Sequence, residues 1–427
     1  MSGNSSLSHQ ALGSELKEAT ASSEAHAAVP SLEDVPDGGW RAWLVVLGSS
    51  LSLFASAGLV NAYGTFQAYY ETDLLPSSSP STISFIGSIQ IFLLYFLGTF
   101  AGRAFDAYGT KARNQLYQVF LSHGVLFGIG ISLLFSPALA VIGHWFRRRR
   151  ALAIGLTTGG SATGGVVVPI LMERLIPTLG FPWAVRVVAF LLLGLLAISC
   201  VTIKTRLPLS GRMSFRTAID LGGFRDPRYA LANIAAFLLF YAFFVPYFYI
   251  QIYADFREVA PHIAHYLLAV MNAMNIVSRI LPGLIADRLG TLPVFVPAAT
   301  ICSVLTLGLW LPSRSAGSVI AFAALYGLFS GAFVSLLPTY IAAISPREKF
   351  GARLGATYIG VAIASLAGTP TAGALLTTTD QSHFNNLIVF TGVLLVAGTV
   401  VMAGAGLVGS PRVQLLGRKR EDAGVEE

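Results

Sequence analysis

Long apolar blocks constrain this chain more than any other feature of its sequence. Each block is about twenty residues long, the length that a helix needs to cross roughly 30 Å of hydrocarbon. The composition agrees, because 54% of the residues are hydrophobic, 11% are charged and the mean hydropathy is +0.67. A membrane β-barrel would show segments of alternating polarity, and none is visible. The sequence therefore predicts an all-α polytopic membrane protein.

Hydropathy predicts eleven spans, divided by a polar stretch into five and six. They lie at residues 43–63, 83–101, 120–142, 151–171, 183–201, 229–249, 263–285, 292–311, 319–341, 355–376 and 387–408. We therefore expect an N-terminal helical bundle at 37–203, a central loop at 204–228 and a C-terminal bundle at 229–410. Residues 1–36 lack an apolar run and are expected to form a disordered tail, and residues 411–427 form a second tail.

Basic residues predict the orientation of the chain. Six bases lie in the central loop, whereas the loop after the first span holds Glu71 and Asp73 and no base. The positive-inside rule then places the central loop and both termini in the cytosol. We expect the plasma membrane, with a vacuolar or other internal membrane as the alternative. The net charge of +7 lies mostly in such short loops, which indicates membrane orientation and not nucleic-acid binding.

One internal repeat marks the two halves. Both copies read G-x-x-x-D-x-x-G after the second span of their half, and the residues concerned are Gly102, Asp106 and Gly109, and Gly283, Asp287, Arg288 and Gly290. The plain interpretation is a tight turn with an Asp that caps the next helix. The paired motifs also resemble the loop signature of the major facilitator superfamily, whose two halves are parallel repeats. This resemblance implies that Asp106 and Asp287 belong to charge pairs that hold one gate closed.

Two further motifs resemble those of monocarboxylate transporter-like members of that superfamily, especially fungal ones. D-G-G-W-R-A-W opens the first span, and W-F-R-R-R-R-A-L-A-I-G-L opens the span at 151–171. The signature residues are Asp37, Gly38, Gly39, Trp40, Trp43, Arg149, Arg150 and Gly155. Membrane anchoring is the plain interpretation of the tryptophans and arginines. The small residue Gly155 fits either static helix packing or a sliding contact between halves.

Arg279 is the outstanding ionisable residue inside a predicted span. A charge buried in a bilayer costs several kcal/mol and is rarely kept without use. Asn275 and Asn272 precede it at helical spacing, so the three residues share one face, which we expect to line a polar cavity. The alternative is that Arg279 snorkels to the nearby cytosolic surface.

The resemblance implies a substrate site with two charges missing. An Arg at the position of Arg279 binds the substrate anion in the monocarboxylate family, while Asn275 replaces an Asp used in proton coupling and Asn61 lies near the place of a Lys. We expect Asn61, Asn272, Asn275 and Arg279 to bind a small anionic substrate, and a coupling proton stays an open alternative. Tyr241 is a candidate for stacking on a flat substrate, although we expect lipid-facing or interfacial positions for most aromatics of 229–249.

The basic loops at Lys111 and Arg147 create a conflict, because both belong in the cytosol but only one span separates them. Asp106 and Arg147 are 41 residues apart, whereas Asp287 and Arg347 are 60 residues apart. The difference is about one helix. We therefore hypothesise a twelve-span plan whose third span is missing between about residues 113 and 118, through a shortened gene model or a real deletion.

These features predict a secondary active transporter or facilitator that moves a small organic anion or fungal metabolite across a lipid bilayer by alternating access. A non-transporting sensor or an inactive transporter paralogue is the alternative. A membrane enzyme is disfavoured, because no catalytic residues at triad or metal-ligand spacing and no phosphate-binding loop are visible. No cofactor, metal or nucleic-acid partner is expected.

Overall fold

The computed structural model describes residues 37–70, 79–108, 125–146, 149–206, 220–346, 349–376 and 380–408. Within these ranges all regular secondary structure is helical, which confirms the all-α prediction. Among the described residues, nine helices are long and apolar enough to cross a membrane, and two shorter apolar helices cover Trp40–Ala55 and Gly130–His144. Each of the eleven predicted spans overlaps one helix or two or three helices in series.

The described part of the N-terminal half contains seven α-helices. They are α2 (Trp40–Ala55), α3 (Ala57–Asn61), α4 (Tyr63–Tyr69), α5 (Pro80–Tyr108), α6 (Val125–Ala140), α7 (Arg150–Leu179) and α8 (Phe181–Thr202), and a 3-10 turn at Val141–His144 extends α6. The first predicted span is thus three short helices, with breaks at Ser56 and Ala62. At the first break the Ser56 hydroxyl donates to the Ser52 carbonyl at 2.7 Å, a side-chain bond to the preceding turn of the kind that bends helices.

Eight α-helices lie in the residues of the C-terminal half that the structure describes. They are α9 (Pro227–Phe243), α10 (Val245–Phe256), α11 (Pro261–Ala264), α12 (Leu267–Leu289), α13 (Leu292–Leu305), α14 (Ala316–Ile344), α15 (Phe350–Ala374) and α16 (Gln381–Val408), and a π-helical turn at Thr306–Trp310 extends α13. The break between α9 and α10 falls at Phe244, two residues before Pro246. Proline has no N–H to donate, so the hydrogen-bond ladder is interrupted there.

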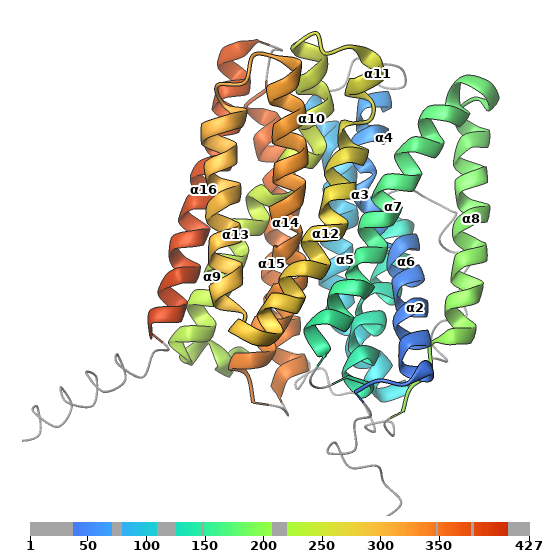
Figure 1. Ribbon diagram of the computed structural model, residues 1–427, viewed down its shortest axis with the longest axis vertical. Coiled ribbons are helices and arrows are strands. Elements are labelled where there is room, and N and C mark those ends of the chain that lie inside the picture. Colours follow the sequence, from blue (N-terminus) through green and yellow to red (C-terminus); the bar gives the residue numbers. More distant parts are fainter. Residues whose placement is uncertain are drawn as a thin grey trace, which may run out of the picture.

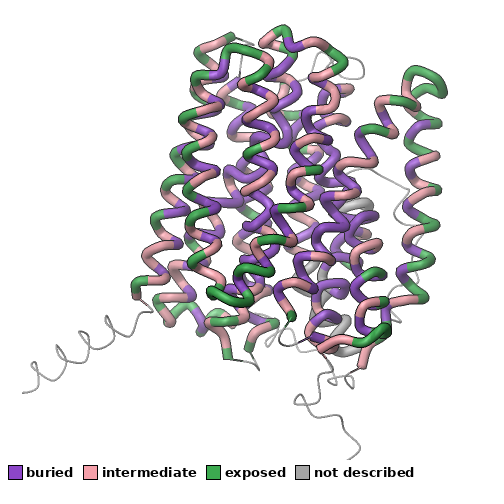
Figure 2. Tube along the Cα trace, viewed as in Figure 1, coloured by how far each residue is buried: buried purple, intermediate pink, exposed green. Residues whose placement is uncertain are grey.

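The two halves lie side by side with their helices roughly parallel to one long direction (Figure 1). Contacts between the halves are made chiefly by α5 against α15 and by α7 against α12. The first described helix begins and the last ends at the same, lower end of the bundle in Figure 1. Buried residues concentrate where the halves meet, and many exposed residues lie on outer helices such as α8 and α16 (Figure 2). Apolar side chains exposed there, such as Phe190 and Val201, suit contact with lipid.

Two consecutive long helices, α5 and α6, run in the same direction. The start of α5 lies at the upper end in Figure 1, where Ser81 donates to the Pro370 carbonyl near the end of α15. The end of α6 lies at the lower end, where Phe146 packs against Trp43 at the start of α2. Consecutive membrane spans ordinarily alternate in direction. This parallel pair therefore agrees with the hypothesis of a missing third span, although residues 109–124 lie outside the described residues and the hypothesis stays a prediction.

The end of the predicted central loop is docked onto the C-terminal half. Arg353 of α15 is buried and forms ion pairs with Asp220 at 3.3 Å and Asp226 at 3.5 Å. Asp226 also caps α9 by accepting from the backbone N–H of Arg228 at 3.0 Å. These contacts fix the start of α9, which begins two residues before the predicted boundary.

Candidate functional site

Arg279 lies at the contact between the two halves, in the middle of α12. Its side chain is buried, its Nε donates to Asn275 Oδ1 at 2.6 Å, and its Nη1 donates to the Thr158 carbonyl of α7 at 2.7 Å and to the Ser161 hydroxyl. These contacts point inward, so the snorkelling alternative is wrong. Within the described part of the chain, no carboxylate pairs with Arg279.

Asn275 is held in place by its own neighbours. Its Nδ2 donates to the Tyr247 hydroxyl at 2.5 Å and lies 3.4 Å from the Ser330 hydroxyl. The Tyr247 and Ser330 hydroxyls are 3.0 Å apart and bonded to each other. With its amide nitrogen engaged, Asn275 presents its oxygen to Arg279. The amide thus orients the guanidinium but does not neutralise its charge.

Asn61 and Asn272 extend this polar cluster away from Arg279. The Nδ2 of Asn272 donates to the Leu268 carbonyl at 2.9 Å and, across the halves, to the Asn61 carbonyl at 3.3 Å. The Nδ2 of Asn61 donates in turn to the Ser161 carbonyl at 3.3 Å. Asn61, Asn272, Asn275 and Arg279 are therefore brought into one connected set. Thr158 and Ser161, which hold the guanidinium, were missed by sequence reasoning although they lie in the glycine-rich segment after Gly155.

Close approach of α7 and α12 depends on glycine. A Cβ atom at Gly155 would collide with the Arg279 carbonyl, and one at Gly283 would collide with the Ala151 carbonyl. Both glycines therefore lie where the halves cross, and only a residue without a side chain fits there. Gly155 therefore lies at a close contact between the halves, which is compatible with both alternatives raised for it.

The cavity beside Arg279 is almost closed in this conformation. Its residual volume is about 10 Å³, too small for an organic molecule. Its lining comes from both halves and consists of Ala57, Val60, Asn61, Leu94, Tyr95, Phe135, Ser161, Phe243, Phe244, Arg279 and Val334. This conformation therefore leaves no room for an organic molecule beside Arg279.

Aromatic rings from both halves pack beside this cavity. Tyr95 of α5 contacts Phe135, Phe240 and Tyr358, with ring centroids 5.8, 5.9 and 5.3 Å away. We call these four residues the aromatic cluster. Aromatic pairs of this kind are worth about 0.5–1.5 kcal/mol beyond their buried area. Sequence reasoning missed Tyr95, Phe135 and Tyr358, because nothing in a single helix indicates a contact made between halves.

Most aromatic residues of the predicted span 229–249 were expected to face lipid or the membrane interface. The structure buries them instead. The buried members are Phe240, Phe243, Phe244, Tyr247, Phe248 and Tyr249. They pack inward because α9 and α10 lie against helices of their own half and of the other half. Tyr229 is buried as well, Phe237 is half-buried, and so is Tyr241. The Tyr241 hydroxyl bonds the Thr371 hydroxyl at 3.0 Å and its ring contacts Phe390, so the structure does not bring it to Arg279.

The second G-x-x-x-D-x-x-G motif lies mostly on a helix and not in a loop. The last turns of α12 carry Gly283, Asp287 and Arg288, and Gly290 caps the helix with a positive φ of 90° that glycine tolerates. Asp287 Oδ2 accepts from the backbone N–H of Leu152 at 3.3 Å. Asp287 therefore interacts with the first turn of α7 in the other half, where the helix dipole favours a carboxylate. It does not cap the next helix, as the plain interpretation expected. Arg288 is exposed.

The first motif is only partly described. Gly102 and Asp106 lie on the backbone of the last turns of α5, in the place that corresponds to Gly283 and Asp287 on α12. The contacts of Asp106 and the whole of Gly109 lie outside the described residues. The expected gating role of Asp106 therefore stays a prediction.

The two signature segments meet at the lower end of the bundle. Gly39 precedes α2 with a positive φ of 88°, Asp37 and Gly38 come before it, and Trp40 is 70% exposed. Trp43 packs edge-on against Phe146, the second residue of the second segment, with ring centroids 5.0 Å apart. Arg149 occupies the N-cap position of α7, but its side chain makes no capping hydrogen bond. The guanidinium of Arg150 lies over the Phe350 ring of the other half, 4.8 Å from its centroid.

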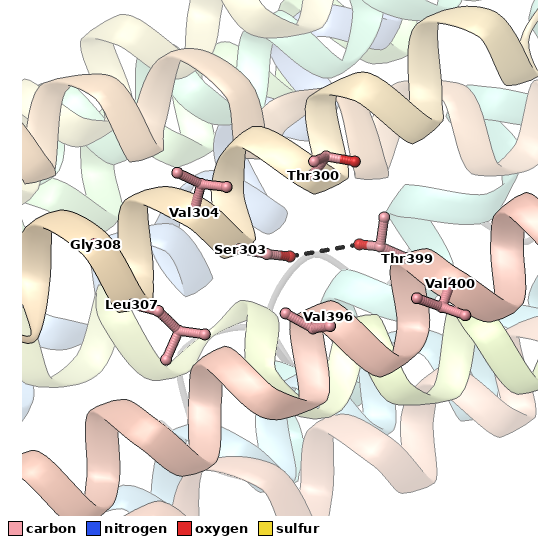
Figure 3. A pocket seen from close by; sticks show the side chains of 8 residues that line it. All are labelled: Thr300, Ser303, Val304, Leu307, Gly308, Val396, Thr399 and Val400. Atoms are coloured by element: carbon pink, nitrogen blue, oxygen red, sulfur yellow. Dashed lines mark hydrogen bonds between the residues drawn. The ribbon is translucent and has the colours of Figure 1, made fainter.

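A larger groove lies elsewhere, between α13 and the neighbouring α16 (Figure 3). Its volume is about 450 Å³ and its lining consists of Thr300, Ser303, Val304, Leu307, Gly308, Val396, Thr399 and Val400. Among its described lining residues, the Ser303 and Thr399 hydroxyls lie 3.5 Å apart across the groove, while each hydroxyl donates to a carbonyl of its own helix. Val304 and Val400 are exposed, so the groove opens on the outer surface. It suits lipid chains better than a charged solute.

The family model described as "Major Facilitator Superfamily" matches residues 112–313 and 232–424. The chain is 38% identical over 395 residues to MFS-type transporter 1 of Ophiocordyceps sp., with 88% of each chain covered. It is 35% identical over 398 residues to the aspyridones efflux protein of Emericella nidulans, covering 89% of this chain and 80% of the relative. It is 35% identical over 389 residues to the agnestins efflux protein of Paecilomyces divaricatus, covering 87% and 88%.

Among solved structures, the crystal structure of the human organic anion transporter MFSD10 (TETRAN) is similar. The TM-score is 0.61 with 16% sequence identity, and the match covers 87% of this chain and 100% of that chain. At this identity the likeness concerns the fold alone.

Proposed function

Because this chain belongs to the major facilitator superfamily, we propose that it exports a small organic anion across a membrane by alternating access of the site around Arg279. Its relatives are transporters and not enzymes, and its fold is that of a transporter. Within the superfamily, the segments at 37–43 and 145–156 support a place near the monocarboxylate transporter-like members. The substrate, the direction and the mechanism are our proposals.

The observation that carries the proposal is the buried, uncompensated charge of Arg279. A guanidinium taken out of water is costly unless a partner offsets it. In this closed conformation its described partners are neutral oxygens of Asn275, Thr158 and Ser161. A substrate carboxylate would replace some of these bonds with stronger, charge-assisted ones. The binding free energy gained there would be specific to anions.

Asn275 makes the substrate the source of negative charge. An Asp at this position could pair with Arg279 in the absence of substrate and would then have to be protonated to release it. An amide cannot do this at any physiological pH. We therefore expect binding at Arg279 to require an anion and not to require a proton at position 275.

Two lines support export of a larger metabolite. Several relatives are named as efflux proteins, for aspyridones, fujikurins and agnestins. The cavity lining of this chain combines Arg279 with Tyr95, Phe135, Phe243 and Phe244. Once the halves separate, these rings would offer apolar and stacking surface beside a single positive charge. A fungal organic acid with a conjugated or aromatic body fits that combination.

We place the lower end of the bundle in Figure 1 in the cytosol of a plasma-membrane protein. The base-rich central loop and both chain ends belong to this end under the positive-inside rule. Asp287 accepts from Leu152 here, and Arg150 meets Phe350. These contacts would form the cytosolic gate, which has to open for loading and close before export. The N-terminal bundle 37–203 and the C-terminal bundle 229–410 would be the moving bodies.

Flux measurements test this proposal. Purified protein in liposomes would be supplied with a panel of labelled aromatic and aliphatic organic acids, and Arg279→Ala and Arg279→Lys would be compared with the wild type. We expect saturable flux that Arg279→Ala abolishes and that Arg279→Lys partly keeps, because Lys preserves the charge but not the planar fork. Arg186→Ala, an exposed arginine stacked on Trp183 of α8, is the matched control.

The same experiment addresses the alternative of a sensor or an inactive paralogue. Absence of flux in the wild type for every acid, with binding of an acid that still depends on Arg279, would favour a sensor. Flux that is equal in wild type and Arg279→Ala would contradict the assigned site.

A further inference from the structure

His265 and Glu173 join the two halves at the upper end of the bundle in Figure 1, opposite the described chain ends. His265 lies between α11 and α12 of the C-terminal half, and Glu173 lies near the end of α7 in the N-terminal half. His265 Nδ1 is 2.7 Å from Glu173 Oε1. The side chains are 36% and 32% exposed, so water and protons reach both groups.

A second carboxylate acts on the same histidine. Asp255 of α10 interacts electrostatically with His265, so His265 has one acidic neighbour in each half. The other charged or titratable groups of the surrounding elements are Arg174, Arg257, Glu258, His262 and Tyr266. Arg257 is occupied within its own half, because its guanidinium lies over Tyr253 and Phe256 and its Nε donates to the Tyr253 hydroxyl. Glu173 and Asp255 are therefore the described groups that would balance a positive charge on His265.

The strength of this contact depends on one proton. Histidine gains and loses its proton near neutral pH. A protonated His265 forms a charge-assisted bond with the Glu173 carboxylate, roughly twice as strong as the bond that a neutral imidazole makes. Loss of the proton to water therefore weakens the link between the halves but leaves each half intact.

The position of the pair gives this change a consequence for the whole molecule. The helices α7 and α12 cross closely at Gly155, and their contact continues to Asp287 and Leu152 at the lower end. His265 and Glu173 join the halves near the opposite end of this contact between α7 and α12. Opening of the cavity beside Arg279 by separation of α7 and α12 at this end would have to break this contact.

We propose that His265 and Glu173 form a proton-binding site that closes the upper end of the transporter. A proton on His265 stabilises the closed upper end, and its loss favours opening. This proposal rests on the proposed function in one respect, since that function makes the upper end the external mouth. An acidic exterior then holds the mouth closed and slows export. The proton binds and leaves at the same end and is not carried with the substrate.

A distance measurement tests the site without any substrate. The exposed residues Thr178 on α7 and His262 on α11 would be replaced by Cys for spin labelling, with exposed Cys200 replaced by Ser. Replacing His262 also removes the other histidine of this region. The measurement would use full-length protein in lipid nanodiscs. We expect the population with the longer, open distance to rise at least about threefold relative to the closed population between pH 5.5 and pH 8.5.

Two variants and one matched control complete the test. His265→Gln and Glu173→Gln keep a polar side chain but remove the charge, so both should give an open-to-closed ratio that no longer changes with pH. His383→Gln is the control, because His383 Nδ1 is also 2.7 Å from a carboxylate, that of Asp380, within one half. This variant should keep the wild-type response. A wild type without a pH response, or variants that keep it, would overturn the proposal.

Failure of the two proposals can be distinguished. Arg279→Ala should lose anion flux but keep the pH-dependent distances, whereas His265→Gln should keep flux but lose its inhibition by external acid. If no variant and no wild type transports any acid while the distances still respond to pH, the proposed function fails and the proton site stands. If flux depends on Arg279 but the distances do not respond, the proton site fails.

Discussion

The guanidinium of Arg150 lies 4.8 Å from the ring centroid of Phe350, and each of these residues begins the helix that corresponds to the other's in the opposite half. The start of α7 thus meets the start of α15 at the lower end of the bundle. Together with the bond from Leu152 to Asp287, this contact joins the halves at the end that we assign to the cytosol.

Loss of the Arg150 contact should loosen the lower end. A cation–π pair contributes about 0.5–2 kcal/mol, depending on how far it is removed from water. We expect Arg150→Gln to raise the open population of this end by about two- to thirtyfold, measured as the reaction rate of a Cys placed at Leu152. Arg149→Gln, the adjacent residue, is the control and should leave the rate unchanged. Equal rates in all three proteins would show that Arg150 does not hold the gate.

Replacing Asn275 by Asp should convert an anion site into one that competes with its own carboxylate. Asn275 Oδ1 is already 2.6 Å from Arg279 Nε, so an Asp would form an ion pair without rearrangement. We expect anion affinity near neutral pH to fall at least tenfold and flux to increase as the pH falls and the carboxylate is protonated. Asn385→Asp on α16 makes the same charge change away from Arg279. Unchanged affinity in Asn275→Asp would argue against substrate binding at Arg279.

A methyl group at Gly155 should obstruct the crossing of α7 and α12. The added Cβ would meet the Arg279 carbonyl, and overpacking of this kind costs about 1–3 kcal/mol. We expect Gly155→Ala to lower the melting temperature and to reduce flux severely. Gly194→Ala on α8 is the control, because a Cβ there meets nothing within 4 Å. Equal stability and flux in the two variants would mean that the halves do not need this close approach.

Arg353 should matter for stability and much less for transport. Arg353→Met would leave Asp220 and Asp226 without their buried cation, and breaking such a pair costs up to about 3–5 kcal/mol. Lys349→Met is the comparison, since Lys349 is 59% exposed and 3.9 Å from Asp220 and should contribute less than about 1 kcal/mol. Thermal unfolding in detergent would measure both. Similar melting temperatures would show that the central loop is not fixed by Arg353.

The missing third span can be tested at the level of the transcript. If the gene model is shortened, sequencing the mature message should reveal about twenty additional apolar codons between the codons for Arg113 and Gln118. If the deletion is real, the message should match the chain as printed. The parallel direction of α5 and α6 is explained by either result, because one crossing of the membrane is removed in both.

The sequence alone determined the class of this protein and the residue to which its proposed function is tied. Blocks of about twenty apolar residues leave helices as the only viable form in lipid, because every backbone polar group must be satisfied within its own segment. A lone arginine in such a block is costly wherever it lies, so Arg279 was recognisable without a structure. Its companions Asn272 and Asn275 followed from helical spacing. These are properties of single helices, which a linear sequence contains.

Only the tertiary structure decided what each of these residues touches. Packing of two halves separated by many residues brought Thr158 and Ser161 to Arg279, placed Asp287 against Leu152 rather than at the next helix, and paired His265 with Glu173. It also buried most of the aromatic residues of α9 and α10 that were expected to face lipid, while Tyr241 was directed toward Thr371. In a bilayer both a lipid-facing and a buried position of a helix are apolar, so hydropathy cannot distinguish them. That choice depends on contacts between helices, which exist only once the halves are assembled.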